Sequence, residues 1–465
     1  MSKHPTGTVA AVTTNELDPR TPVIVGAAAA HQHFDDPTEA REATALMAQA
    51  VERAELDAGV PGLAAHAEWI GVPKGLWGYT DPGRAVAERC GATGARTALF
   101  EIGVLQPTLF ARACRAIAAN ELDVAIVVGG EAKYRSLRAT MLGNPELAAE
   151  SDGRGAADDY VVPAVDVLHH LEIERSLPIP ARQYAILESA MRAADGRSID
   201  EHRRAVAELW AGFSAVAVEN PDAWNRRPVG VDDLLGTPDN PVLALPYTKL
   251  HCSQWNVDQA AAFLICSVEA ARRLGTDERQ WVFPHAIVES NFMTPVVRRA
   301  EMFRSPAMEA VGSALAETID RELASLPLLD IYSCFPAAVQ LQLRAMDIPS
   351  TRPLTITGGM TFGGGPLNNY TFQALAKLVE LLRARPDEIG VVTAVSGMVT
   401  KFGATAWSCT PPSGAQPAHV DVTDRAAAAT RELDVDGDYV GDAVVAGYTV
   451  VHDRGVPSEV VVIAD

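Results

Sequence analysis

From about residue 22 onward, short apolar runs alternate with amphipathic stretches of helical period. Residues 22–30 predict a buried strand, and residues 42–56 predict an amphipathic helix. Further strands are predicted at 67–74, 97–103 and 123–131, with helical segments between them. Strands that are apolar on both faces must be covered on both faces. The alternation therefore predicts an α/β fold with parallel strands and helical crossovers on both sides.

One pattern occurs twice around a glycine that precedes a helix. Gly103 lies seven residues before Phe110, and Gly365 lies seven residues before Phe372. In each case the helix leads into an apolar strand. Two unrelated α/β units can look alike in this way. The alternative is a duplicated fold in which two equivalent helix N-termini approach a common centre, where their partial positive charge suits an oxyanion or enolate.

The segment from 132 to 240 interrupts this alternation. It is polar and rich in Asp, Arg and Pro, with a helix predicted at about 182–193. A longer helix begins near Ser198, because Glu201 follows at the spacing of a capping box. We interpret the segment as an insertion that covers one edge of the first α/β unit.

The residues after Pro411 differ again. A linker with Pro412, Gly414 and Pro417 is followed by an acidic stretch and then by two β-strands. Two strands alone are marginally stable in water, so they are expected to belong to a small β-unit packed on the core.

Charge and composition exclude several classes of protein. The formal net charge is −20, which repels nucleic acid, so no nucleic-acid partner is expected. The longest apolar run, Ala260 to Cys266, is far shorter than the roughly 20 residues of a membrane span. The first twenty residues contain no apolar stretch of a secretory signal, so we expect a cytoplasmic protein. The six cysteines are scattered and include no Cys-x-x-Cys pair, which argues against a metal site.

Five segments together resemble thiolases: DVAIVVGGEA, the long run from PYTKLHCSQW to ARRLG, DIYSCFPAAVQ, TGGMTFGGGPLNN and VSGMVTKFG. They are most similar to the sterol-carrier-protein thiolase branch, and within it to bacterial thiolase-like proteins of type 1, which have an additional C-terminal domain. The resemblance covers about residues 20–410. It implies two duplicated βαβαβαββ halves forming a layered αβαβα core, with a loop-domain insertion and a small C-terminal β-unit. The implied organisation is a tail (1–20), a first half (21–275) with the insertion (132–240), a second half (276–410), and a linker with the C-terminal unit (411–465).

The resemblance also locates the positions of thiolase chemistry. Thiolases use a nucleophilic cysteine at a helix N-terminus, a histidine that activates it, a polar residue that holds the thioester oxygen or a water, and a second cysteine for proton transfer. The corresponding positions here are Gly103, Gly365, Tyr332 and Val395. None of these side chains can perform the family's chemistry, so standard thiolase activity is predicted to be absent. Tyr332 could act as an acid or base if its pKa were lowered.

Three other side chains are candidates to replace the missing groups. Cys334 lies in the third motif and is expected to pack rather than react. His251 and Cys252 are adjacent, but adjacency alone does not make a catalytic dyad.

A ligand site is predicted from the same resemblance. Gln254 falls where the family has a serine that contacts pantetheine, and Trp255 beside it either narrows the tunnel or lies in the core. Glycine-rich turns let backbone N–H groups approach a ligand. The predicted ligand-binding residues are Gln254, Trp255, Gly363, Gly364, Gly365, Ser396 and Gly397. No cofactor is required, and coenzyme A or an acyl-CoA is the expected ligand. Lys133, Arg135 and Arg138 are candidates for a basic patch, although a solvated surface role is favoured.

Three hypotheses for function remain open from the sequence. The first is a thiolase-like binding or accessory protein of acyl-CoA metabolism, which is a pseudoenzyme of the acetyl-CoA acetyltransferase type. The second is an enzyme with altered chemistry on acyl-CoA, either retro-aldol cleavage or acyl transfer without a thiol. The third is a structural partner of another enzyme. A homodimer, a complex with another protein and a monomer are all compatible with the sequence.

Overall fold

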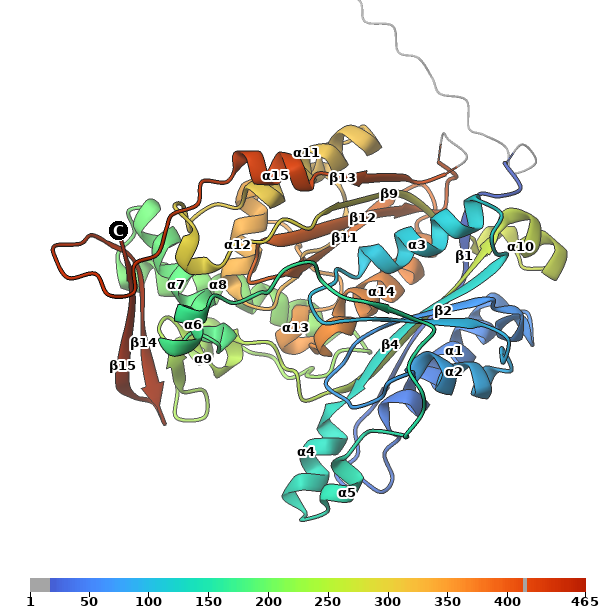
Figure 1. Ribbon diagram of the computed structural model, residues 1–465, viewed down its shortest axis with the longest axis horizontal. Coiled ribbons are helices and arrows are strands. Elements are labelled where there is room, and N and C mark those ends of the chain that lie inside the picture. Colours follow the sequence, from blue (N-terminus) through green and yellow to red (C-terminus); the bar gives the residue numbers. More distant parts are fainter. Residues whose placement is uncertain (1–16, 413–415) are drawn as a thin grey trace, which may run out of the picture.

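The computed structural model describes residues 17–412 and 416–465. Most of the tail predicted at 1–20, and Gly414 of the predicted linker, lie outside these residues. Helices alternate with strands along the described chain, and the strands form three sheets (Figure 1). The predicted α/β class is confirmed. No helix among the described residues is long and apolar enough to cross a membrane.

The first sheet has six strands and contains most of the first predicted half. Its strand order is β1 (Pro22–Gln32), β8 (Asp258–Ser267), β4 (Val124–Ala132), β2 (Trp69–Pro73), β3 (Arg96–Phe100) and β5 (Asp159–Val161). Strands β4, β2 and β3 are parallel, as the alternation predicts, and β5, which lies within the predicted insertion, is parallel to β3. Strand β8, however, is antiparallel to both neighbours, β1 and β4. The sheet is therefore mixed, because β8 follows the long insertion rather than a short helical crossover, and the chain can re-enter in either direction.

The second sheet repeats the arrangement of the first. Its strand order is β10 (Leu328–Asp330), β11 (Ile389–Ser396), β12 (Lys401–Ser408), β9 (Phe283–Ser290) and β13 (Ala418–Asp421). Strand β10 is parallel to β11, and β12 is antiparallel to β11 and β9. The series β2, β4, β8, β1 in the first sheet has the same directions. Strand β13, from the segment after Pro411, pairs with β9 at the edge of this sheet.

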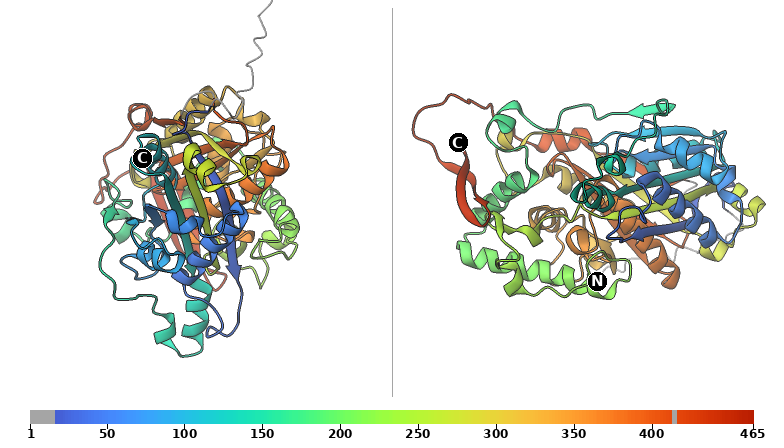
Figure 2. Two further views of the ribbon diagram at one scale, coloured as in Figure 1. Left: turned by 90° about the vertical axis from the view of Figure 1, so that its right-hand side faces the viewer. Right: turned by 90° about the horizontal axis from the view of Figure 1, so that it is seen from below.

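Helices cover both faces of the two sheets (Figures 1 and 2). Helices α3 (Pro107–Ala118) and α14 (Tyr370–Ala384) contact strands of both sheets and so lie between them. Helices α1 (Ala43–Ala58) and α2 (Pro82–Cys90) lie on the outer face of the first sheet, and α11 (Pro306–Ile319) lies on the outer face of the second.

Aromatic side chains fill the space between the two sheets. Phe110 of α3 makes edge-to-face contacts with Phe263, Phe372 and Trp407, at centroid separations of 5.2 to 5.4 Å. Such contacts add to the hydrophobic gain of burying the rings. The two phenylalanines at equivalent positions of the repeated sequence pattern thus meet in one core.

The predicted insertion is mostly helical. Ser198 caps α8 (Ile199–Glu219), where its hydroxyl accepts a hydrogen bond from Glu201 N and the Glu201 carboxylate accepts one from Ser198 N, which confirms the predicted capping box. The other helices of the segment are α4 (Lys133–Met141), α5 (Pro145–Ala148), α6 (His170–Glu174), α7 (Pro180–Ala194) and α9 (Val231–Leu234). Helices α4 and α5 form an arm beside the first sheet (Figure 1).

A third sheet joins the segment that follows the insertion to the C-terminal segment. Its strand order is β15 (Val456–Ala464), β14 (Val445–Asp453), β6 (Val242–Ala244) and β7 (Tyr247–Thr248). The two predicted C-terminal strands form the hairpin β14–β15, and β14 pairs with β6. A hairpin that is marginal alone is thereby extended to four strands. The other helices are α10 (Val268–Leu274), α12 (Pro336–Ala345), α13 (Gly359–Phe362) and α15 (Thr423–Ala429).

Candidate functional site

The N-termini of α3 and α14 lie next to each other, as the repeated sequence pattern predicts. Gln106, which precedes α3, donates from Nε2 to Asn368 Oδ1 over 2.6 Å. Thr371, in the first turn of α14, donates to Gln106 Oε1 over 3.4 Å. Amide and hydroxyl side chains therefore join the N-termini of the two helices.

A side chain at Gly103 would be strained. Gly103 is buried and has φ +102°, a backbone conformation that side chains rarely adopt. A Cβ atom added there would lie 3.1 Å from Pro163 Cγ. The Gly103 carbonyl accepts a hydrogen bond from the buried ammonium group of Lys401. Gly103 is thus held in place by packing and by this hydrogen bond.

Gly365 lies in a tight turn against the segment 253–254. Its N–H donates to Gln254 O over 2.9 Å, and Gln254 N donates to Met360 O over 3.0 Å. An added Cβ would lie 3.1 Å from Met360 O and 3.3 Å from Ser253 Cβ. A larger side chain at this position would require both neighbours to move.

Tyr332 is positioned by backbone hydrogen bonds rather than through its hydroxyl. Its N–H donates to Thr393 Oγ1 over 2.8 Å, and its carbonyl accepts from Gln342 Nε2 over 2.8 Å. Burial, with a smaller contribution from Cys334, raises the pKa of the Tyr332 phenol well above its usual value. This direction is opposite to the one that a phenolate base requires. Tyr332 keeps its proton at neutral pH and can act only as a donor or general acid.

The turn after β11 has a strained backbone. Val395 is buried and pairs with Phe402, so it presents no reactive group. Gly397, Met398 and Val399 follow Ser396 with φ of 61°, 51° and 64°. Left-handed conformations of this kind are costly for side-chain-bearing residues. The Arg299 guanidinium stabilises the turn, because it donates to Met398 O over 2.6 Å.

The candidate thiols and imidazole are not activated. Burial raises the pKa of Cys334 to about 12 and that of Cys252 to about 12. Burial lowers the pKa of His251 to about 3, and its Nδ1 accepts a hydrogen bond from Thr248 N over 3.1 Å. Only a thiolate is nucleophilic, so neither cysteine is poised to react at neutral pH. These contacts favour a packing role for Cys334 and give no support to a dyad of His251 and Cys252.

Two charged residues near Gly103 were not singled out from the sequence. Lys401 of β12 is 4% exposed, and burial lowers its pKa despite the opposing field of Glu289. Glu289 of β9 accepts a hydrogen bond from Thr108 Oγ1 over 2.7 Å, and its other oxygen lies 3.1 Å from His419 Nε2. In the sequence, Lys401 and Glu289 stand out only because each is a charged residue in an apolar strand.

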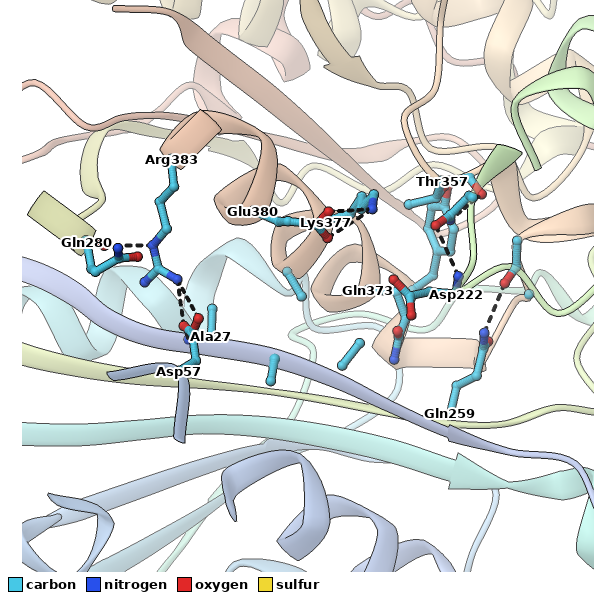
Figure 3. A pocket seen from close by; sticks show the side chains of 17 residues that line it. Ala27, Asp57, Asp222, Gln259, Gln280, Thr357, Gln373, Lys377, Glu380 and Arg383 are labelled. Carbon is cyan, nitrogen blue, oxygen red and sulfur yellow. Dashed lines mark hydrogen bonds and ion pairs between the residues drawn. The ribbon is translucent and has the colours of Figure 1, made fainter. Parts of the chain in front are cut away.

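The predicted ligand-binding residues separate into three places. Gln254 and Gly365 lie together in one turn, whereas Ser396 and Gly397 lie in the strained turn after β11. Gly363 and Gly364 line a cavity of about 360 Å³ between β1, α14 and the end of α8 (Figure 3). Trp255 is 50% exposed, so it is not a core residue. Its exposed indole is available to a ligand or a partner.

Burial removes Arg135 from the predicted basic patch. Arg135 is 8% exposed, its N–H donates to Asp258 Oδ1, and its guanidinium lies 3.4 Å from Glu150. It is therefore neither a solvated surface residue nor free to bind a phosphate. Among the described residues, no group of His, Cys, Asp and Glu side chains is arranged to hold a metal ion.

Three solved structures were compared with this arrangement. The chain is similar to a monomeric SCP2-thiolase-like protein type 1 from Mycobacterium smegmatis, with 27% identity over 94% of this chain and 87% of that chain and a TM-score of 0.78. It is also similar in fold to an Ltp2–ChsH2(DUF35) aldolase, with 18% identity over 83% of this chain and 98% of that chain and a TM-score of 0.61. A third match is an acetyl-CoA acetyltransferase from Syntrophomonas wolfei, with 14% identity over 84% of this chain and 99% of that chain and a TM-score of 0.58. No protein-family model and no curated protein sequence matches the chain.

Proposed function

The chain has a thiolase-like fold, and from this premise we propose that it is a binding or accessory protein of acyl-CoA metabolism without thiolase activity. The observation that carries the proposal is the backbone conformation and close packing of Gly103. Its φ of +102° and its contact distance to Pro163 disfavour a nucleophilic side chain at this position, and its carbonyl accepts a hydrogen bond from the Lys401 ammonium. Gly365 and Val395 likewise provide neither a base nor a second thiol.

The finer organisation of the fold is part of this proposal. We propose two duplicated halves, 21–275 and 276–410, with a loop-domain insertion at 132–240 and an additional C-terminal unit at 411–465. The matching strand directions of the two large sheets support the duplication. Strand β13 pairs with the second sheet and β14 pairs with β6, so the C-terminal unit shares sheets with the core and with the segment that follows the insertion. A cytoplasmic location is proposed on the sequence grounds given above.

Coenzyme A or an acyl-CoA is the proposed ligand. Gln254, Gly365 and the exposed Trp255 are adjacent in the chain segments that would meet the pantetheine arm. At about 100 times its dissociation constant a ligand adds roughly 2.7 kcal/mol to folded-state stability, so the melting temperature should rise by a few degrees. Differential scanning calorimetry with coenzyme A, acetyl-CoA and a steroid-like acyl-CoA would measure this rise.

The Trp255→Ala variant is the matched test of the binding surface. An exposed indole contributes little to the core, so the variant should fold normally and lose most of the ligand-dependent rise in melting temperature. If none of the three ligands shifts the melting temperature at millimolar concentration, acyl-CoA binding is refuted. The hypothesis of a structural partner of another enzyme would then be favoured, with a homodimer or a heteromeric complex distinguished by the mass in solution.

A second candidate function is altered chemistry on acyl-CoA, by retro-aldol cleavage or by acyl transfer without a thiol. The protonated Tyr332 phenol favours it, because a general acid can protonate an enolate as it forms. Tyr332→Phe removes only the hydroxyl and is expected to abolish any such activity. It should change stability by no more than about 1 kcal/mol, the usual scale of one hydrogen bond.

Tyr370→Phe is the control for this prediction. The Tyr370 hydroxyl donates to the buried Asp330 carboxylate over 2.6 Å and lies 2.9 Å from Thr357 Oγ1. Its removal leaves a buried carboxylate under-satisfied, so this variant should lose about 1–3 kcal/mol of stability. An acyl-CoA lyase activity that survives in Tyr332→Phe at full rate would show that the phenol transfers no proton.

A further inference from the structure

Strand β15 is an edge strand of the third sheet, and among the described residues it pairs with β14 alone. The hairpin lies at the end of the molecule opposite the first sheet (Figures 1 and 2). Pro457 and Glu459 are confined to the first four residues of β15, and residues 460–464 are all aliphatic. Proline and charged residues protect the edge strands of natural sheets from further pairing. The second half of β15 lacks this protection and is therefore open to pairing with another chain.

The register of the hairpin shows which backbone groups of β15 face outward. Val462 lies opposite Tyr448, and Val460 lies opposite Val450. The Tyr448 N–H donates to Ser189 Oγ of α7 over 2.8 Å. The Val450 carbonyl accepts from the segment between β6 and β7 over 2.9 Å. These groups of β14 point away from β15, and residues opposed in an antiparallel pair direct their groups both inward or both outward. Val460 and Val462 therefore direct their N–H and C=O groups to the open side.

A groove of about 900 Å³ follows the same edge. All residues from 459 to 465 line it, and consecutive residues of a strand point to opposite faces, so the groove lies along the edge rather than on one face. Its other side is formed by α6 and the loop 433–439. Arg175 donates to Gly437 O over 3.2 Å, and a Cβ atom added at Gly437 would lie 2.9 Å from Leu171 Cδ2. The loop is thus packed on α6.

The groove combines apolar and acidic side chains. Val460 and Val462 are 61% and 48% exposed. Five carboxylates and one cation line the groove: Glu174, Asp434, Asp436, Glu459, Asp465 and Arg175. Of the five carboxylates only Glu459 has an ion pair with a described residue, Arg182, at 3.5 Å. A chain that binds here with complementary charge therefore supplies cations as well as apolar side chains.

We propose that β15 is a docking edge for an extended segment of a partner protein in which basic residues alternate with aliphatic ones. Such a segment adds a strand to the third sheet by hydrogen bonds to Val460 and Val462. Side chains alternate along a strand, so its aliphatic side chains extend the apolar surface while its basic side chains reach the carboxylates. A second copy of this chain is a poor occupant, because self-pairing brings two sets of carboxylates together. The proposal goes beyond acyl-CoA binding and does not rest on it.

Fluorescence anisotropy with labelled peptides of nine residues, the length of β15, tests this edge on the full chain. A peptide of alternating Lys and Val is expected to bind, and more weakly as salt is added. Glu in place of Lys should weaken binding at least about tenfold, because the groove is acidic. Pro in place of Val keeps the charge but removes N–H groups and should weaken binding by a similar factor. No binding of the Lys–Val peptide, or equal binding of the Lys–Pro peptide, would overturn the proposal.

The Val462→Pro variant tests the backbone pairing. It removes an outward N–H without removing a hydrogen bond to β14, so the variant should fold. Binding of the Lys–Val peptide is expected to weaken about tenfold or more. Val462→Thr keeps the shape and the N–H and is the control, with an affinity within about twofold of the natural chain. Hydrogen exchange of residues 456–464, followed by mass spectrometry, should slow when the peptide binds the natural chain. Unchanged binding in Val462→Pro, or no slowing of exchange, would refute the docking edge.

A double variant, Asp434→Asn with Asp436→Asn, tests the charge of the groove. It is expected to bind the Lys–Val peptide about tenfold more weakly, with a smaller difference at high salt. Glu52→Gln with Glu269→Gln is the control, because these exposed residues of α1 and α10 change the net charge equally at the other end of the molecule (Figure 1). An equal loss in both double variants would overturn the proposal. Sedimentation of the natural chain distinguishes the other occupant, because a dimer that Val462→Pro dissociates would assign the edge to a second copy and refute the basic partner.

Discussion

Thiolysis of acetoacetyl-CoA, and the reverse condensation, are expected to proceed only at background rate. In the proposed assignment, Gly103, Gly365 and Val395 occupy the positions of the nucleophile, the base and the second thiol. Removing the catalytic residues of a covalent mechanism typically lowers the rate by a factor of about 10⁴ to 10⁶. A coupled assay of free coenzyme A consumption, on protein prepared from a host without thiolase, would measure the residual rate. Turnover near the common enzyme scale of about 10 per second would contradict the proposal.

Introducing a cysteine at Gly103 is expected to fail as a rescue. The φ of +102° and the 3.1 Å approach to Pro163 strain any side chain there, which should cost about 1–3 kcal/mol of stability. The new thiol would also lack an activating histidine, because Gly365 cannot provide one. Gly103→Cys should therefore be less stable and still inactive, as judged by thermal unfolding and the same assay.

Gly59 supplies the control for this substitution. It ends α1 with φ +70°, and an added Cβ would meet no atom within 4 Å. Gly59→Ala should therefore report backbone strain without crowding, at about 1 kcal/mol. If Gly103→Ala is no more destabilising than Gly59→Ala, the closure of the Gly103 position by packing is wrong. Thiolysis gained by Gly103→Cys alone would contradict the loss of the base.

The parts of the fold that could be predicted from the sequence depend on residues that lie close together in the chain. The capping box of Ser198 and Glu201 involves residues three apart, so its spacing alone located the start of α8. The repeated spacing before Phe110 and Phe372 placed two helices side by side, and their N-termini do meet through Gln106. The direction of β8 could not be predicted, because a strand that follows a long insertion carries no local signal of its orientation.

The sequence predicts which residues belong to the candidate site, but not what surrounds them in the folded chain. The motifs located Gly103 and Tyr332, yet the hydrogen bond from Lys401 to Gly103 joins residues 298 apart in the chain. The pKa of Tyr332 depends on burial, which the motif does not encode. The hydrogen bond from Gln259 Nε2 to Gly363 O depends in the same way on packing between β8 and the turn before α14. Distant contacts of this kind require the folded chain.

The melting temperature is expected to fall as the pH rises from about 5 to about 8, because burial raises the pKa of three carboxyl groups in the folded chain. Burial raises the pKa of Glu131 to about 7, that of Glu150 to about 8 and that of Asp258 to about 6. Arg135 lies 3.4 Å from Glu150, and its N–H also binds Asp258. In this range the folded chain holds protons that the unfolded chain has released. Stability is therefore greatest below the unfolded pKa values and declines as the folded carboxyls ionise.

Glu131→Gln isolates one of these groups. A rise in the pKa of Glu131 from 4.5 to about 7 corresponds to about 3 kcal/mol of folding stability that is lost as the pH rises through the range. A neutral amide at this position does not ionise, so this loss should not occur in the variant. The variant should therefore have a flatter dependence of melting temperature on pH than the natural chain and should be the more stable of the two at pH 8. Asp277→Asn is the control, because hydrogen bonds from Arg279 lower the pKa of Asp277 to about 2, outside the range. Calorimetric melting curves between about pH 5 and pH 8 would measure this dependence for both variants and the natural chain. An unchanged slope in Glu131→Gln would mean that its carboxyl is ionised in the folded protein throughout, and that Arg135 or Lys133 compensates its charge.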